Sequence, residues 1–239
     1  MGCFLTNSSL GRKLVMSISG CFLVLFLLFH MAMNVVALIG DGSAYNMICG
    51  FLGANWYALV GTAVLALGVL VHFVYAFWLT YQNRKARGNV RYAVTVTEKG
   101  VDWASKNMLV LGIIVLGVIG FHLTHFWAEM QYVEWFKGEH VAPESVYALM
   151  EITFGKWWMV AIYIVWFAAL WFHLTHGFWS ALQTIGWSNQ IWEKRLECAG
   201  KALATLFFVC LTVTAVVAYC VANGIIPGSV LTCCCGGCC

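Results

Sequence analysis

The sequence predicts an all-α integral membrane bundle of five transmembrane helices. Hydrophobic residues make up 62% of the 239-residue chain and only 10% are charged, a composition far from that of soluble globular proteins. Mean hydropathy is +0.83. Apolar segments of about 20 residues or more, enough to cross a hydrocarbon core of about 30 Å, are expected at residues 13–39, 55–81, 107–130, 157–186 and 202–222. They belong to one membrane domain, residues 1–225, and a cysteine-rich tail follows at residues 226–239.

Basic residues or a glycine stand at the ends of these segments. Lys13 opens the first segment, whose apolar run is too long for a cleavable signal. The second ends before Arg84 and the third begins after Lys106. The fourth ends at Gly186 and the fifth begins after Lys201. The chain has only two prolines, so we expect largely unbroken helices.

The basic residues are placed asymmetrically. Of the 13 lysines and arginines, 11 stand at the start of the first segment or lie between segments two and three or four and five. The positive-inside rule therefore predicts a cytoplasmic N-terminus, an outside C-terminus and a multi-pass location in the inner (cytoplasmic) membrane. The net charge of +3 reflects this asymmetry and does not indicate nucleic acid binding. The basic face could bind acidic lipid headgroups or a soluble partner.

Four consecutive segments each contain a histidine: His30, His72, His122 and His173. Burying an ionisable side chain in a bilayer is costly unless a partner compensates. A rise of about 1.5 Å per residue places His30 and His122 roughly 25 Å from the cytoplasmic end, and His72 and His173 roughly 18–20 Å. These layers predict an outer and an inner pair of axial ligands for two b haems stacked across the bilayer. The alternative is that each histidine only hydrogen-bonds a neighbouring helix.

Three further histidines are weaker candidates. His125 and His176 follow His122 and His173 by three residues and share a similar helix face. They could replace those ligands, or bind a propionate, a carbonyl or a quinone. His140 lies among glutamates in an outer loop, where we expect it to be solvated.

Several stretches resemble the cytochrome b membrane subunit of succinate dehydrogenases and fumarate reductases, in its single-polypeptide, dihaem, b558-like form. Residues 11–20, GRKLVMSISG, with His30 and Asn34, are similar to its first helix. Residues 172–186, FHLTHGFWSALQTIG, resemble its fourth helix, and the likeness covers about residues 10–225. The second helix and following loop of that family share these residues: His72, Leu79, Asn83, Ala86, Arg87 and Tyr92. The resemblance implies that His173 rather than His176 is a ligand and, by the same logic, favours His122 over His125.

The resemblance implies a membrane-anchor and electron-transfer subunit. Such a subunit holds a flavoprotein and an iron–sulfur protein on the cytoplasmic face. It passes electrons between their iron–sulfur clusters and a membrane quinone, with menaquinone favoured, through two haems. This chain has no nucleotide fingerprint and no ferredoxin-type cysteine run, so flavin, clusters and dicarboxylate catalysis belong to the partners. The physiological direction and a dimer of the whole complex are left open.

Polar residues near the segment ends supply further candidates. Haem propionates could bind Ser17, Trp103 and Gln183, although Ser17 and Gln183 could equally be ordinary helix-end groups. Family precedent favours a quinone site near the outer haem. Candidates there, each of which could instead face water, are Tyr45, Asn46, His125 and Glu129. Some family members carry a proton-conducting glutamate where this chain has Trp171, so a proton route of that kind would need other residues.

Cysteines are concentrated in the last seven residues of the chain. Five of the 11 cysteines stand at residues 233–239, on the side where disulfides persist. They could form disulfides, bind a metal or be a low-complexity end with no role, and no spacing matches a zinc motif. Two alternatives remain. One is the quinone-linked dihaem subunit of a formate dehydrogenase or hydrogenase. The other is a haem-free, histidine-containing transporter, which would predict broken helices or repeats.

Overall fold

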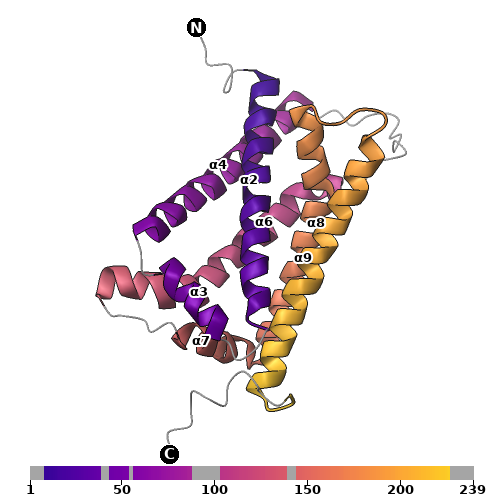
Figure 1. Ribbon diagram of the computed structural model, residues 1–239. Coiled ribbons are helices and arrows are strands. Elements are labelled where there is room, and N and C mark those ends of the chain that lie inside the picture. The colour runs from indigo at the N-terminus through magenta and orange to yellow at the C-terminus, as the bar shows by residue number, and fades with distance from the viewer. Residues whose placement is uncertain (1–7, 39–42, 54–55, 88–102, 139–143, 227–239) are drawn as a thin grey trace, which may run out of the picture. The chain divides into compact units, whose positions relative to one another are not determined.

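The computed structural model describes residues 8–38, 43–53, 56–87, 103–138 and 144–226 (Figure 1). Throughout these ranges the regular secondary structure is helical and no strand is present. The elements are α2 (Ser9–Val36), α3 (Ser43–Gly53), α4 (Trp56–Arg87), α5 (Trp103–Lys106), α6 (Met108–His122), η1 (Leu123–Lys137), α7 (Glu144–Phe154), α8 (Trp157–Ile185) and α9 (Glu193–Ala222). The all-α prediction is confirmed.

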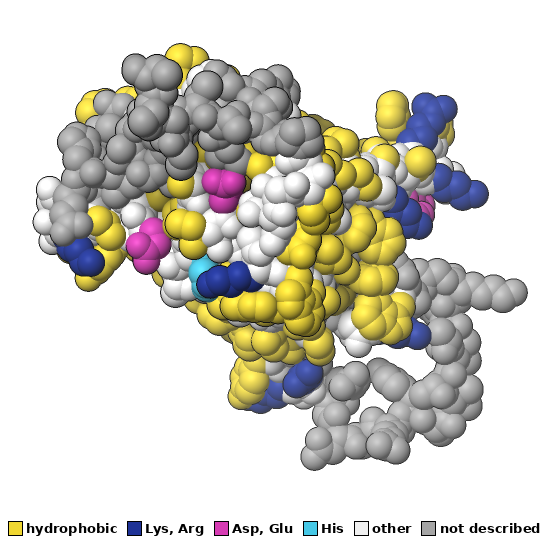
Figure 2. All heavy atoms as spheres, turned by 90° about the horizontal axis from the view of Figure 1, so that it is seen from below, with side chains coloured by type: hydrophobic (Ala, Val, Ile, Leu, Met, Phe, Trp, Pro, Cys, Tyr) yellow, Lys and Arg dark blue, Asp and Glu magenta, His cyan; other side chains and the backbone are white. Residues whose placement is uncertain are grey.

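Five helical segments are long and apolar enough to cross a membrane. They are Ser9–Val36, Trp56–Ala86, Met108–Val133, Trp157–Ile185 and Glu193–Ala222. Large apolar side chains on them are exposed, including Leu25 at 65% and Leu67 at 60%. Figure 2 shows hydrophobic side chains over much of the surface that is visible on one face. Because lipid is the solvent that accepts such a surface, the chain is a multi-pass membrane protein.

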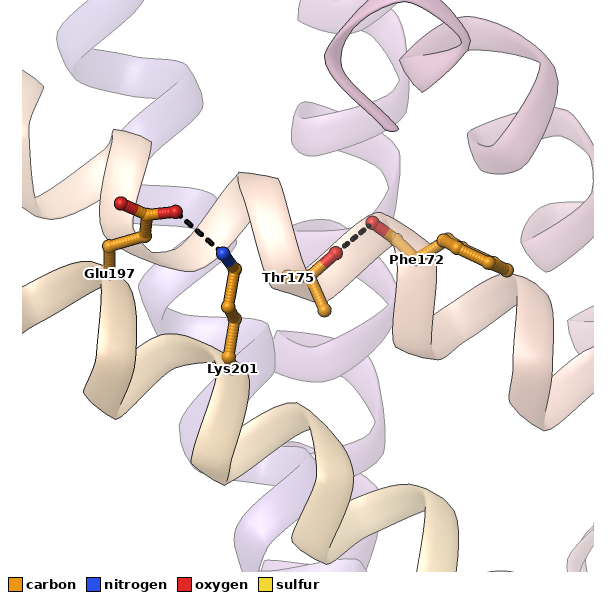
Figure 3. Close-up of polar contacts among 4 residues, drawn as sticks. All are labelled: Phe172, Thr175, Glu197 and Lys201. Atoms are coloured by element: carbon orange, nitrogen blue, oxygen red, sulfur yellow. Dashed lines mark hydrogen bonds and ion pairs between the residues drawn. The ribbon is translucent and has the colours of Figure 1, made fainter. Parts of the chain in front are cut away.

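The last helix begins earlier than its apolar run. It was expected from residue 202, whereas α9 starts at Glu193. The Asn189 side-chain oxygen accepts hydrogen bonds from the amides of Ile191 and Trp192, each at 3.0 Å, in the turn before it. Glu197 and Lys201 then form a 2.6 Å ion pair one turn apart (Figure 3). Charged residues with good helix propensity extend the helix beyond the segment that hydropathy detects.

The first helix is also longer at its start. It was expected from Lys13, but α2 begins at Ser9. The Ser8 hydroxyl accepts a 2.8 Å hydrogen bond from the Gly11 amide. This is the bond by which a serine caps a helix N-terminus and satisfies an otherwise free amide.

The third membrane segment changes its hydrogen bonding at His122. An unbroken α-helix was expected, but the chain continues as the π-helix η1. Wider π turns are uncommon and are frequent at functional sites. The segment ends at Gly138, whose φ of 67° lies in the left-handed region that glycine adopts without strain.

Two short helices were not expected from the sequence. Helices α3 and α7 lie outside the five apolar segments, and α7 packs against α3 and η1. Tyr45 of α3 meets Tyr147 of α7 with ring centroids 6.3 Å apart. Both tyrosines are buried, so their packing accounts for the pairing of these helices.

The chain divides into two compact units, and each long helix contributes to both. Unit 1 comprises Met1–Leu27, Ala63–Ile113 and Leu170–Thr205. Unit 2 comprises Leu28–Thr62, Ile114–Ala169 and Leu206–Cys239. Unit 1 therefore contains His72 and His173, and unit 2 contains His30 and His122. Each predicted histidine pair falls within a single unit.

Candidate functional site

Unit 1 brings His72 of α4 and His173 of α8 together. Their ring centroids are 6.4 Å apart and the ring planes meet at 74°. The two residues are 101 positions apart in the sequence, so the helix packing creates the pair. It is the combination that the depth estimate predicts for the inner ligands.

Unit 2 brings His30 of α2 and His122 of α6 together. Their ring centroids are 5.8 Å apart and the planes meet at 88°. Other aromatic rings surround His122, with centroids at 5.0 Å for Phe126, 5.8 Å for Trp166 and 6.2 Å for Tyr163. This is the combination that the depth estimate predicts for the outer ligands.

Both pairs have the spacing that a shared haem iron requires. A metal–nitrogen bond of about 2 Å to each imidazole, whose centre lies about 1 Å further on, separates the two ring centroids by about 6 Å. The protein supplies two axial ligands and the porphyrin supplies the others. Within the described ranges, no group of three or more His, Cys, Asp or Glu side chains could hold a metal ion.

Small residues line the histidines of unit 1. A Cβ added to Gly20 of α2 would lie 3.3 Å from Cε1 of His72, and one added to Gly112 of α6 would lie 3.6 Å from Cε1 of His173. The Ser19 hydroxyl lies 3.2 Å from Nδ1 of His72. Nδ1 of His173 is buried and has no hydrogen-bond partner among the described residues. Glycines thus let two helix backbones approach the imidazoles closely.

In unit 2, aromatic side chains rather than glycines lie beside the His122 ring. The Tyr163 hydroxyl lies 3.4 Å from Nδ1 of His122, and Tyr163 itself is 1% exposed. The ring of Phe154 meets Tyr163 at a centroid distance of 5.0 Å. The indole nitrogen of Trp166 is buried without a hydrogen-bond partner among the described residues. Among the described residues, the Trp166 N–H is therefore a hydrogen-bond donor without a partner, and its ring lies next to His122.

All three predicted propionate contacts fall in unit 1. Ser17 is buried at 6% exposure on α2. Trp103 opens the short helix α5 and packs on Phe172, the neighbour of His173, with a centroid distance of 5.1 Å. Gln183 is exposed in the last turn of α8. The structure thus places the three residues in the unit of His72 and His173, and their propionate role stays a prediction.

The four predicted quinone contacts fall in unit 2, but they do not form one group of contacts. Burial is the main cause that raises the pKa of Tyr45. The side-chain oxygen of Asn46 is buried without a partner among the described residues. Nδ1 of His125 faces its own helix, 2.9 Å from the Phe121 carbonyl oxygen. Glu129 is exposed. Asn46 is therefore the candidate with a buried polar atom still to be satisfied.

Trp171, where the sequence resemblance would place a proton-conducting glutamate, has a structural contact. Its indole nitrogen donates a 3.0 Å hydrogen bond to the Thr205 hydroxyl and links α8 to α9. Further along α8, Thr175 donates a 2.8 Å hydrogen bond to the Phe172 carbonyl (Figure 3). His176 packs its ring on Trp179, 5.3 Å away. His140 and the cysteine tail lie outside the described residues.

Sequence reasoning missed the residues that support the histidines. Ser19, Gly20, Tyr163 and Trp166 were not singled out, and neither was Tyr147 on the unexpected helix α7. The serine–glycine pair within an apolar run was a usable signal, because small residues mark close helix contacts in membranes. The aromatic residues gave no such signal in a chain with 12 tryptophans, 9 tyrosines and 16 phenylalanines.

Comparison of the chain with protein-family models, with curated proteins and with solved structures gives no match.

Proposed function

We propose that this chain is the membrane anchor and electron-transfer subunit of a succinate or fumarate–quinone oxidoreductase in the inner membrane. One observation carries the proposal. Each compact unit holds two histidines from different membrane helices, with ring centroids 6.4 and 5.8 Å apart. Four ionisable side chains at membrane depth need a function that repays their burial, and axial ligation of two b haems does so.

Each histidine pair has a separate proposed role in such a subunit. His72 with His173, and His30 with His122, would each hold one haem between two helices. When bound, the haems supply one-electron transfer between the partner's iron–sulfur clusters and a quinone. The aromatic side chains around His122 would limit the access of water to that ligand, which is one of the means by which a protein tunes such a centre.

The residues of α3 are the best support for a quinone contact. The Asn46 side-chain oxygen is buried without a partner among the described residues, and an amide oxygen can accept a hydrogen bond from the hydroxyl of a reduced quinone. Tyr45 is buried beside it in the sequence. Menaquinone as the native quinone follows from the sequence resemblance alone.

Co-purification tests the choice of partners. A tagged chain is extracted from native membranes in mild detergent, and the bound proteins are identified by mass spectrometry. We expect a flavoprotein and an iron–sulfur protein, together with succinate-dependent reduction of a quinone. Recovery of formate dehydrogenase or hydrogenase subunits would assign the same two histidine pairs to another enzyme.

A variant with fewer basic side chains tests the docking of the partner proteins in the same experiment. Arg84 and Lys85 are exposed in the last turn of α4, on the side that is predicted to be cytoplasmic. Replacing both with glutamine should lower the recovery of the partner proteins, because complementary charge steers docking, and should leave haem content unchanged. Equal recovery from the variant would limit these charges to setting topology.

A further inference from the structure

Ser19 is a buried polar residue beside a candidate haem ligand. It lies on α2 in unit 1 with 8% of its surface exposed. Its hydroxyl oxygen is 3.2 Å from Nδ1 of His72, which belongs to α4, 53 residues further along the chain. The two helices are therefore joined by a polar contact at the ring that would hold the iron.

The hydrogen of this hydroxyl has another destination. Ser19 donates it to the carbonyl oxygen of Met16, one turn earlier, at 3.0 Å. A serine hydroxyl has one hydrogen and two acceptor lone pairs. Towards His72 it therefore acts as the acceptor, and Nδ1 of His72 carries the hydrogen.

This hydrogen on Nδ1 fixes the tautomer of the His72 ring. A neutral imidazole with hydrogen on Nδ1 has its lone pair on Nε2, the nitrogen that is then able to bind iron.

We propose that Ser19 is a positioning residue that fixes His72 in the tautomer and ring orientation that present Nε2 to a haem. The proposal rests on the proposed function, because it assumes that His72 binds a haem. Gly20 contributes to the same contact, since a Cβ there would lie 3.3 Å from Cε1 of His72. The serine binds one edge of the ring, and the adjacent glycine gives the ring its room.

The other ligand in unit 1 lacks such a contact. Nδ1 of His173 is buried and has no hydrogen-bond partner among the described residues. Partners on the far nitrogen orient a ligating imidazole and change its basicity. Ser19 therefore makes the two ligands of this haem unequal, and its loss should alter the electronic properties of this haem and leave those of the haem at His30 and His122 unchanged.

The test compares Ser19→Ala, Ser19→Thr and the wild type in the purified complex. Redox titration and low-temperature electron paramagnetic resonance report the midpoint potential and the g values of each haem. The haem that His72→Ala removes identifies the relevant signals. We expect Ser19→Ala to shift one midpoint potential and one set of g values, and Ser19→Thr, which keeps the hydroxyl, to resemble the wild type.

Thr214→Val is the matched control. Thr214 is also buried, at 3% exposure, and its hydroxyl donates to a carbonyl of its own helix, that of Cys210, at 2.9 Å. No histidine contact is found for it among the described residues. Deleting this hydroxyl should leave both midpoint potentials and both sets of g values unchanged.

Each outcome of this comparison supports or refutes the role of Ser19 in fixing the His72 tautomer. Loss of the His72 haem in Ser19→Ala with recovery in Ser19→Thr would support it, as would the expected shift. Wild-type spectra in Ser19→Ala, or loss of haem from both serine variants, would overturn it and reduce Ser19 to a packing residue. The wild-type spectrum is recorded first, because absence of haem there would refute the proposed function and not the tautomer assignment alone.

Discussion

The two histidine pairs reach a similar ring separation in different surroundings. In unit 1, Gly20 and Gly112 bring helix backbones against the rings of His72 and His173. In unit 2, His122 is surrounded by the side chains of Phe126, Tyr163 and Trp166. One separation of two histidine rings can therefore be fixed by close backbone approach or by aromatic packing. The two designs should respond differently to added volume and to a lost hydroxyl.

Removing a ligand should have the largest effect. His72→Ala or His173→Ala should remove one haem, and His30→Ala or His122→Ala should remove the other, because an iron keeps only one protein ligand in each variant. Haem-to-protein ratios of the purified variants should fall from two to one. A variant that retains both haems would remove that histidine from the ligand set.

Added volume should distinguish the two units. Gly20→Val places a branched side chain where a Cβ is already 3.3 Å from His72, and overpacking of this kind costs about 1–3 kcal/mol. We expect partial loss of the unit 1 haem, measured by its electron paramagnetic resonance signal per chain. Gly112→Val should be milder, because its Cβ contact is 3.6 Å.

Gly117→Val is the control for volume. It introduces the same side chain into α6, but a Cβ on Gly117 meets nothing within 4 Å. It should keep both haems. If Gly117→Val lowers haem content as much as Gly20→Val does, helix propensity and not contact with His72 explains the loss.

A lost hydroxyl in unit 2 should have a smaller effect than one in unit 1. Tyr163 lies 3.4 Å from Nδ1 of His122, which is long for a hydrogen bond, whereas Ser19 lies 3.2 Å from Nδ1 of His72. Tyr163→Phe should retain both haems and shift a midpoint potential by less than Ser19→Ala does. A larger shift from Tyr163→Phe would reverse this ranking of the two contacts.

The smallest effect concerns α7, away from the histidines. Burial raises the pKa of Glu151 above its usual range. A carboxyl whose folded pKa is raised stabilises the fold below its unfolded pKa, and this contribution is lost as pH rises through the folded pKa. Glu151→Gln stays neutral, so its thermal midpoint should exceed that of the wild type by more at pH 8 than at pH 4. A difference that does not change with pH would contradict this.

Hydropathy and helix rise were enough to predict a large part of this molecule. The five apolar segments follow from residue transfer energies, and the combinations His30 with His122 and His72 with His173 follow from depth. The early start of α9 at Glu193 was missed, because charged helix-forming residues do not register as apolar. The π-helix η1 was missed because its wider turns leave no signature in composition.

The residues in contact with the histidines could not be predicted in the same way. Ser19 and Tyr163 contact histidines only because particular helix faces meet. Hydropathy averaged around a helix does not show how the helix is rotated about its axis, so it does not predict these contacts. Helices α3 and α7 are too short for a span criterion, so the contact between Tyr45 and Tyr147 was hidden as well. The histidine contacts and the tyrosine contact both depend on how helices pack against one another, and a hydropathy pattern does not give that packing.

Haem quantification on the purified wild-type protein shows whether the two histidine pairs bind two haems. The chain is extracted with its partners, and haem is measured as its pyridine complex against protein determined by amino-acid analysis. Two b haems per chain is the predicted result, one for each histidine pair. A preparation with intact helices and no haem, or with one haem per chain, would contradict the account.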